Sequence, residues 1–278
     1  MNMKKLLFAA TLVAMLPLLF SCGKQNNGGE NQFEEPRFIQ YAGKLVPRGG
    51  EPAPAARIAP EATSQITFLE FTESGLFVIG RQLLGGLEFT SGTYTTKDGL
   101  TFTLSNGMTV TLSGTSGTVT VTISPSGETF KADFTRATTT NTAFRTWNIE
   151  KVRATVQGFG DPVTAQFDGC DLSQIKKFLN ENGHKGDYLP DCKLLSITLT
   201  GANTVLFTFS DNVPDVGSCS LSGDNVNFSW TSNSRLFELE NAKATINYMD
   251  GKCILKIDAG LKGSTTSGSV TFVMSPMD

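Results

Sequence analysis

The chain has 278 residues, of which 23 are Lys or Arg and 26 are Asp or Glu, giving a formal net charge of −3. This mildly acidic balance, without a run of cationic residues, argues against nucleic acid as a partner, because phosphate binding depends on clustered Lys and Arg. Gly and Phe are abundant, with 28 and 20 copies, and Thr and Ser crowd residues 90–142. Such a composition is typical of antiparallel β-sheet.

The chain begins with a pattern typical of export. Lys4 and Lys5 precede an uncharged, mostly apolar stretch from Leu6 to Phe20. A positive start followed by a short apolar run indicates a secretory signal. Pro17 and the polar residues after Phe20 interrupt the run before it reaches the roughly 20 apolar residues that span a bilayer. We therefore expect residues 1–21 to be a cleaved signal peptide.

The junction Leu19-Phe20-Ser21-Cys22 resembles the lipobox of bacterial lipoproteins. This resemblance implies that Cys22 carries lipid and becomes the N-terminus of a membrane-anchored protein. Gly23, rather than Asp, follows the Cys, which in that family favours the outer membrane. Residues 22–36 are rich in Asn, Gln and Gly and predict a flexible tether. The alternative is an ordinary secretory signal that ends near an incidental Cys.

Residues 37–138 predict a first β domain. Apolar residues alternate with Thr in runs such as residues 118–123, and short Gly-containing segments separate the runs, as in hairpins. About eight strands result, enough to close a small antiparallel barrel. The expected strands are residues 38–46, 66–71, 76–82, 87–96, 100–104, 108–112, 118–123 and 129–135.

After a polar break at residues 138–142, residues 143–278 predict a second β domain. Alternation slips at Glu150 and Lys151, which indicates a β-bulge. Residues 171–182 have helical spacing, with Asp171 as N-cap and Gly183 at C′. The other expected strands are residues 144–156, 194–200, 204–210, 217–221, 225–231, 236–240, 243–249, 252–258 and 269–274. The predicted fold class is therefore all-β: two tandem antiparallel meander barrels, with one short helix in the second.

The segment Thr146-Trp147-Asn148-Ile149 places a Trp near the start of the second meander, which there resembles the lipocalin-like domains of the calycin group. Arg145 stands where true lipocalins have Gly. The predicted helix follows the first strand, as in fatty-acid-binding proteins. The resemblance implies a barrel with a pocket for a small apolar molecule, although the same side chains would fill a solid core equally well. The candidate ligand-binding residues are Phe207, Phe209, Phe228, Trp230 and Tyr248.

Four cysteines follow Cys22, all in the second domain: Cys170, Cys192, Cys219 and Cys253. An even number in an exported protein predicts two disulfides, with three possible connectivities. We favour Cys170 with Cys192, because they bracket the predicted helix, which leaves Cys219 with Cys253. A zinc site is not expected, since no C-x-x-C pair is present.

No catalytic motif is recognisable in the sequence. The only histidine, His184, follows the predicted helix and reads as a surface residue. Asp211 and Asp215 lie in a turn that offers at most a weak calcium site. We expect a non-enzymatic envelope lipoprotein, without cofactor, that binds a small apolar or glycan ligand. The alternatives are a structural or protein-interaction subunit of an envelope complex, and a hydrolase that uses loop carboxylates.

Overall fold

The computed structural model describes residues 43–48, 65–84, 86–137, 143–157, 160–230, 235–236, 243–260 and 267–277. The predicted signal peptide, Cys22 and the tether at residues 22–36 lie outside these residues. Phe33–Asp278 form one compact unit. Within the described part of the chain, no helix has the length and apolar character needed to cross a membrane.

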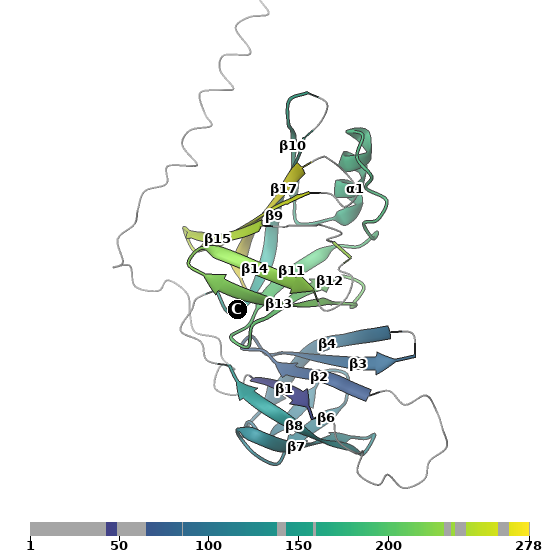
Figure 1. Ribbon diagram of the computed structural model, residues 1–278, viewed down its shortest axis with the longest axis vertical. Coiled ribbons are helices and arrows are strands. Elements are labelled where there is room, and N and C mark those ends of the chain that lie inside the picture. The colour runs from purple at the N-terminus through teal and green to yellow at the C-terminus, as the bar shows by residue number, and fades with distance from the viewer. Residues whose placement is uncertain are drawn as a thin grey trace, which may run out of the picture. The chain divides into compact units, whose positions relative to one another are not determined.

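The first domain is a closed antiparallel barrel of eight strands in meander order, as predicted (Figure 1). Its closing pair is β1 with β8, in which Leu45 lies opposite Phe134. The strands are β1 (Gly43–Pro47), β2 (Gln65–Phe71), β3 (Leu76–Leu83), β4 (Gly86–Thr96), β5 (Thr101–Leu104), β6 (Thr109–Leu112), β7 (Gly117–Ser124) and β8 (Glu128–Arg136).

Aromatic side chains occupy the interior of this first barrel. Phe71, Phe77 and Phe102 are fully buried and Tyr94 nearly so. The Tyr94 hydroxyl donates a hydrogen bond of 2.9 Å to the carbonyl of Thr72, which satisfies its polar end. The alternating strands therefore turn their bulkiest apolar residues inward, where they pack as a core.

The second domain is also a closed barrel of eight strands, to which β10 adds a ninth strand at the edge of β9. β17 closes the barrel by pairing with β9 along almost its whole length. The strands are β9 (Thr146–Val156), β10 (Val163–Asp168), β11 (Leu194–Leu199), β12 (Thr204–Phe209), β13 (Asp215–Ser222), β14 (Asn225–Trp230), β15 (Lys243–Met249), β16 (Lys252–Gly260) and β17 (Ser267–Pro276).

The predicted bulge lies in β9. Lys151 pairs with Val273, and the next pair joins Ile149 to Met274, so Glu150 is the extra residue. The first part of β9 pairs with β11, whereas its second part pairs with β10. The sequence did not predict β10.

The one described helix, α1 (Leu172–Glu181), begins and ends where the sequence predicts. The Asp171 side chain accepts a hydrogen bond of 3.0 Å from the amide of Ser173. At the C-terminal end Gly183 has φ +80°. The amide of Gly183 bonds to the carbonyl of Asn180, and that of His184 to the carbonyl of Leu179. These two bonds make up the Schellman motif.

The expectation of two disulfides is not met, because all four cysteines are free thiols. Cys219 lies on β13 and Cys253 on β16, and β14 and β15 separate these strands in the sheet. Three strand spacings amount to about 14 Å along the sheet. Cα atoms more than about 7 Å apart cannot be bridged without backbone movement.

The other expected pair, Cys170 and Cys192, flanks a short antiparallel bridge between Asp171 and Lys193. The two cysteines are therefore diagonal neighbours rather than directly opposite residues. Diagonal neighbours in an antiparallel pair lie about 7–8 Å apart, beyond the usual Cα separation of a disulfide. Of the predicted strand at residues 236–240 only Leu236 is described, and it lies in a bend; the other four residues lie outside the described part of the chain.

Two buried glutamates of β2 and the following turn make hydrogen bonds to the second barrel. Glu70 accepts bonds from the hydroxyls of Thr200, at 2.6 Å, and Thr204, at 2.5 Å. Glu73 accepts a bond of 2.6 Å from the amide of Gly201. Both carboxylates are almost inaccessible to solvent, and this burial raises the pKa of each.

Candidate functional site

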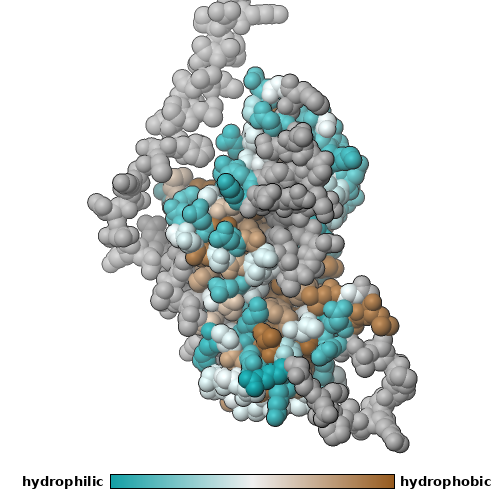
Figure 2. Space-filling view, in the orientation of Figure 1, coloured by the Kyte–Doolittle hydropathy of each residue, from teal (hydrophilic) through white to brown (hydrophobic). Residues whose placement is uncertain are grey.

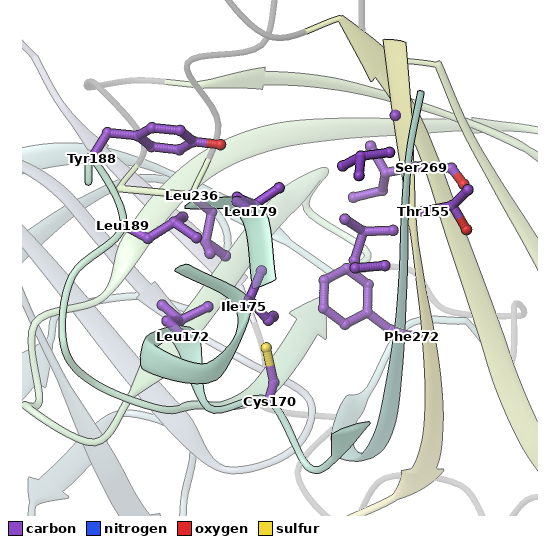
Figure 3. Close-up of a pocket in the computed structure, with 15 residues that line it drawn as sticks. Thr155, Cys170, Leu172, Ile175, Leu179, Tyr188, Leu189, Leu236, Ser269 and Phe272 are labelled. Atoms are coloured by element: carbon purple, nitrogen blue, oxygen red, sulfur yellow. The ribbon is translucent and has the colours of Figure 1, made fainter. Parts of the chain in front are cut away.

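An apolar cavity of about 80 Å³ lies in the second barrel, between α1 and the strands β9 and β17. In Figure 3 the helix side chains stand on one side of the cavity, and Phe272 reaches toward them from β17. The lining residues are Ala154, Thr155, Val156, Cys170, Leu172, Ile175, Leu179, Tyr188, Leu189, Leu236, Ile257, Gly268, Ser269, Val270 and Phe272.

Small residues on the two strands leave this space open. Gly268 lies opposite Val156, and Ala154 lies opposite Val270. A Cβ atom on Gly268 would come within 3.0 Å of the Thr155 carbonyl oxygen, so even Ala would fit poorly there. The β9–β17 pair therefore does not fill the barrel up to the helix, and a void remains beneath α1.

The helix supplies the opposite wall through one apolar face. Leu172, Ile175 and Leu179 all line the cavity and are buried. On the same helix Phe178 packs against Phe167 of β10, with ring centroids 6.2 Å apart in an edge-to-face arrangement. The helical spacing in the sequence predicted this stripe, and the structure shows that part of it faces a void rather than solid core.

Two polar groups of the cavity lining, the Thr155 hydroxyl and the Cys170 thiol, are poorly placed for ionic chemistry. The Thr155 hydroxyl is hydrogen bonded to the Thr164 hydroxyl on β10, at 2.9 Å, and in Figure 3 it points away from the helix. Burial raises the pKa of the Cys170 thiol to about 12, so the thiol stays protonated at neutral pH. The cavity is therefore suited to hydrocarbon.

Four of the five predicted ligand-binding residues have described side chains, and these four do not lie at this cavity. Phe207 and Phe209 of β12 are fully buried in the core, and Phe228 packs partly buried against it. Tyr248 is 37% exposed on β15, and the side chain of Trp230 lies outside the described part of the structure. None of the four whose side chains are described belongs to the cavity lining. The sequence pointed to these residues because their aromatic side chains are large. The cavity instead forms beside small residues, Ala154 and Gly268.

Asp211 and Asp215, the candidate ligands of a weak calcium site, form ion pairs with Arg235. Arg235 donates to Asp211 at 2.5 Å and to Asp215 at 3.3 Å. Across the described residues no group of three or more His, Cys, Asp or Glu side chains gathers as metal ligands would. His184, expected at the surface, is only 9% exposed.

Comparison with known proteins gives no relative from which a function can be transferred. No family model matches the chain. No curated protein and no solved structure matches it either. Barrels of this kind serve many unrelated functions, so the function of this chain depends on the chemistry of its site.

Proposed function

We propose that this chain is a lipid-anchored lipoprotein of the cell envelope, in the outer membrane, that binds a small apolar ligand in its second barrel without catalysing a reaction. The proposal combines the lipobox-like segment ending at Cys22 with the cavity beneath α1. The cavity is the observation that carries the binding function. Its lining is almost entirely carbon, so a glycan would leave its hydroxyls without partners there.

The size of the cavity limits what can bind. Pockets for drug-sized ligands have volumes of about 300–1,000 Å³, whereas this cavity has about 80 Å³. A water molecule takes up about 30 Å³ in the liquid, so the space accommodates a short hydrocarbon group only. The expected ligand is therefore the end of an aliphatic chain, with its polar end in solvent.

The test is a titration of the mature chain carrying Cys22→Ala with straight-chain carboxylates from butanoate to dodecanoate, followed by methyl NMR. Each methylene that enters the cavity contributes about 0.8 kcal/mol, which lowers Kd roughly fourfold. Kd should fall with chain length and then level off once the cavity is full. The methyl signals of Ile175, Leu179 and Val270 should shift.

A matched control identifies the site. Ile175→Phe places a larger side chain in the cavity wall and should weaken binding at every chain length. Leu195→Phe changes a residue that is 47% exposed on the same barrel and should not. The proposal fails if the carboxylates shift no methyl signal of the second barrel, or if Ile175→Phe binds them as the parent does.

A second candidate, an accessory subunit that binds another envelope protein, is supported by the hairpin of β3 and β4. Leu84 at its tip is 93% exposed, and Figure 2 shows hydrophobic surface in this part of the molecule. β4 pairs with β5 only from Tyr94 to Thr96. Cross-linking in intact cells from Leu84, replaced by a photoreactive residue, would test this candidate. Adducts to one envelope protein would support it, and a ladder without discrete adducts would count against it.

A further inference from the structure

Four side chains of the cavity wall belong to no strand or helix, and Leu236 is the one among them that follows an ion-paired arginine. Leu236 lies between β14 and β15, where it and Arg235 are the two described residues. Its side chain is 8% exposed, packs in the core of the barrel and lines the cavity (Figure 3). Leu236 is adjacent to Arg235 in the chain, so its position depends on how Arg235 is held.

Polar contacts hold Arg235, the residue that precedes Leu236. The Arg235 amide donates a hydrogen bond of 2.8 Å to one oxygen of Asp215, and its Nε donates to the other oxygen at 3.3 Å. Its remaining guanidinium nitrogens donate to Asp211 and to the carbonyl of Val213. The guanidinium also lies over the Phe209 ring, 4.1 Å from its centroid.

These contacts hold both the backbone and the side chain of Arg235. The Asp215 side chain is only 6% exposed, and a charge-assisted pair at such a site is geometrically strict because the planar guanidinium has fixed donor directions. Consecutive Cα atoms are 3.8 Å apart. Fixing the backbone at residue 235 therefore fixes the point from which the Leu236 side chain enters the barrel.

We infer that Leu236 determines the length of aliphatic chain that the cavity accepts, and that Arg235 is the positioning residue that holds Leu236 in the wall. This inference rests on the proposed apolar-ligand function. Arg235 does not line the cavity, so its effect on binding passes through Leu236. The expected ligand is therefore an unbranched aliphatic chain whose buried end contacts Leu236.

The same carboxylate series tests the inference through the chain length at which Kd levels off. Leu236→Ala removes three carbon atoms from the wall and should move that point to chains about three methylenes longer. The longest chains should then gain tens of fold in affinity, at about fourfold for each methylene. Leu236→Val, a smaller change, should move the point by about one methylene and serves if the Ala variant folds poorly.

Arg235→Gln tests the positioning role. It should weaken binding and make the chain length at which Kd levels off less sharply defined. In a Leu236→Ala background it should have no further effect, because the side chain through which it acts has been removed. Arg48→Gln is the matched control: it breaks an exposed Arg–Asp pair in the first barrel and should leave binding unchanged.

The outcomes separate this inference from the function on which it rests. If the parent binds the series and Leu236→Ala levels off at the parent's chain length, Leu236 does not set the length. If Arg235→Gln has the same effect with and without Leu236→Ala, Arg235 does not act through Leu236. If no chain binds the parent or any variant, the proposed function itself is wrong.

Discussion

Phe71 of β2 and Phe102 of β5 stack face to face inside the first barrel, with ring centroids 3.7 Å apart and planes 11° apart. Tyr94 closes the cluster edge-on, at 5.1 Å from Phe71 and 5.5 Å from Phe102. These three rings come from strands that are not all adjacent, so they meet only because the sheet closes. These rings fill the interior of the first barrel as part of its hydrophobic core.

We expect Phe102→Ala to destabilise the first barrel by about 3–5 kcal/mol, because a cavity remains where the stacked ring was. Both tryptophans, Trp147 and Trp230, lie in the second barrel. In a urea titration, the first transition followed by circular dichroism should therefore occur at a lower urea concentration. The midpoint followed by tryptophan fluorescence should shift less. Leu84→Ala, at a 93% exposed position, should change stability by less than about 0.5 kcal/mol. Equal effects of the two substitutions would show that Phe102 is not part of a packed core.

The free cysteines predict a distinct order of alkylation in the native protein with Cys22→Ala. Cys192 is half-buried and should react first with iodoacetamide, whereas Cys219 and Cys253 should react only on unfolding. Burial raises the pKa of the Cys219 thiol to about 12, which slows its reaction further. Intact mass spectrometry without reductant, after alkylation in denaturant, should count four modified thiols. A disulfide-linked pair would show that the chain adopts a different arrangement around these residues.

The buried Glu73 predicts that stability falls as pH rises. Burial raises the pKa of its carboxyl from 4.5 to about 7. Below pH 4.5 the group is protonated in both the folded and the unfolded chain, and its contribution is fully present. Between pH 4.5 and 7 the unfolded chain loses the proton while the folded chain keeps it, so the free energy of unfolding decreases. The loss is about 1.4 kcal/mol for each unit of pKa shift.

Urea titrations between pH 5 and 8 measure this dependence. Glu73→Gln keeps the side chain neutral at every pH and should flatten the profile, with the remaining slope due in part to Glu70, whose pKa is also raised by burial. Glu88→Gln alters an exposed carboxylate of β4 and should leave the slope as it is. A Glu73→Gln profile as steep as that of the parent would show that Glu73 does not carry the dependence.

The proposed anchor predicts that Cys22→Ala moves the protein from the membrane fraction to the soluble fraction or leaves it unprocessed. Lipid chains contribute about 0.8 kcal/mol per buried methylene, and without them only the chain's own surface remains to bind a membrane. Fractionation with immunoblotting measures the distribution, and Cys192→Ala should remain with the membrane. Unchanged fractionation of Cys22→Ala would rule the anchor out.

The sequence alone determined the local features of this protein. Period-two alternation and Gly-containing turns predicted nearly every strand, the slip at Glu150 predicted the bulge, and Asp171 and Gly183 predicted both ends of α1. These features depend on residues that are close together along the chain, so short sequence patterns are enough to predict them. β10 was missed because its alternation is short and its side chains remain largely exposed.

Tertiary structure decided which strands close each barrel, which cysteines approach one another and where the barrel interior is left unfilled. The cavity exists because Gly268 and Ala154, far apart in sequence, both lie in its wall beneath the helix, opposite Val156 and Val270. Arg235 reaches the Asp211–Asp215 turn for a similar reason, since folding brings two separate connections together. A void is a property of the space between side chains, and no single segment of sequence contains that information.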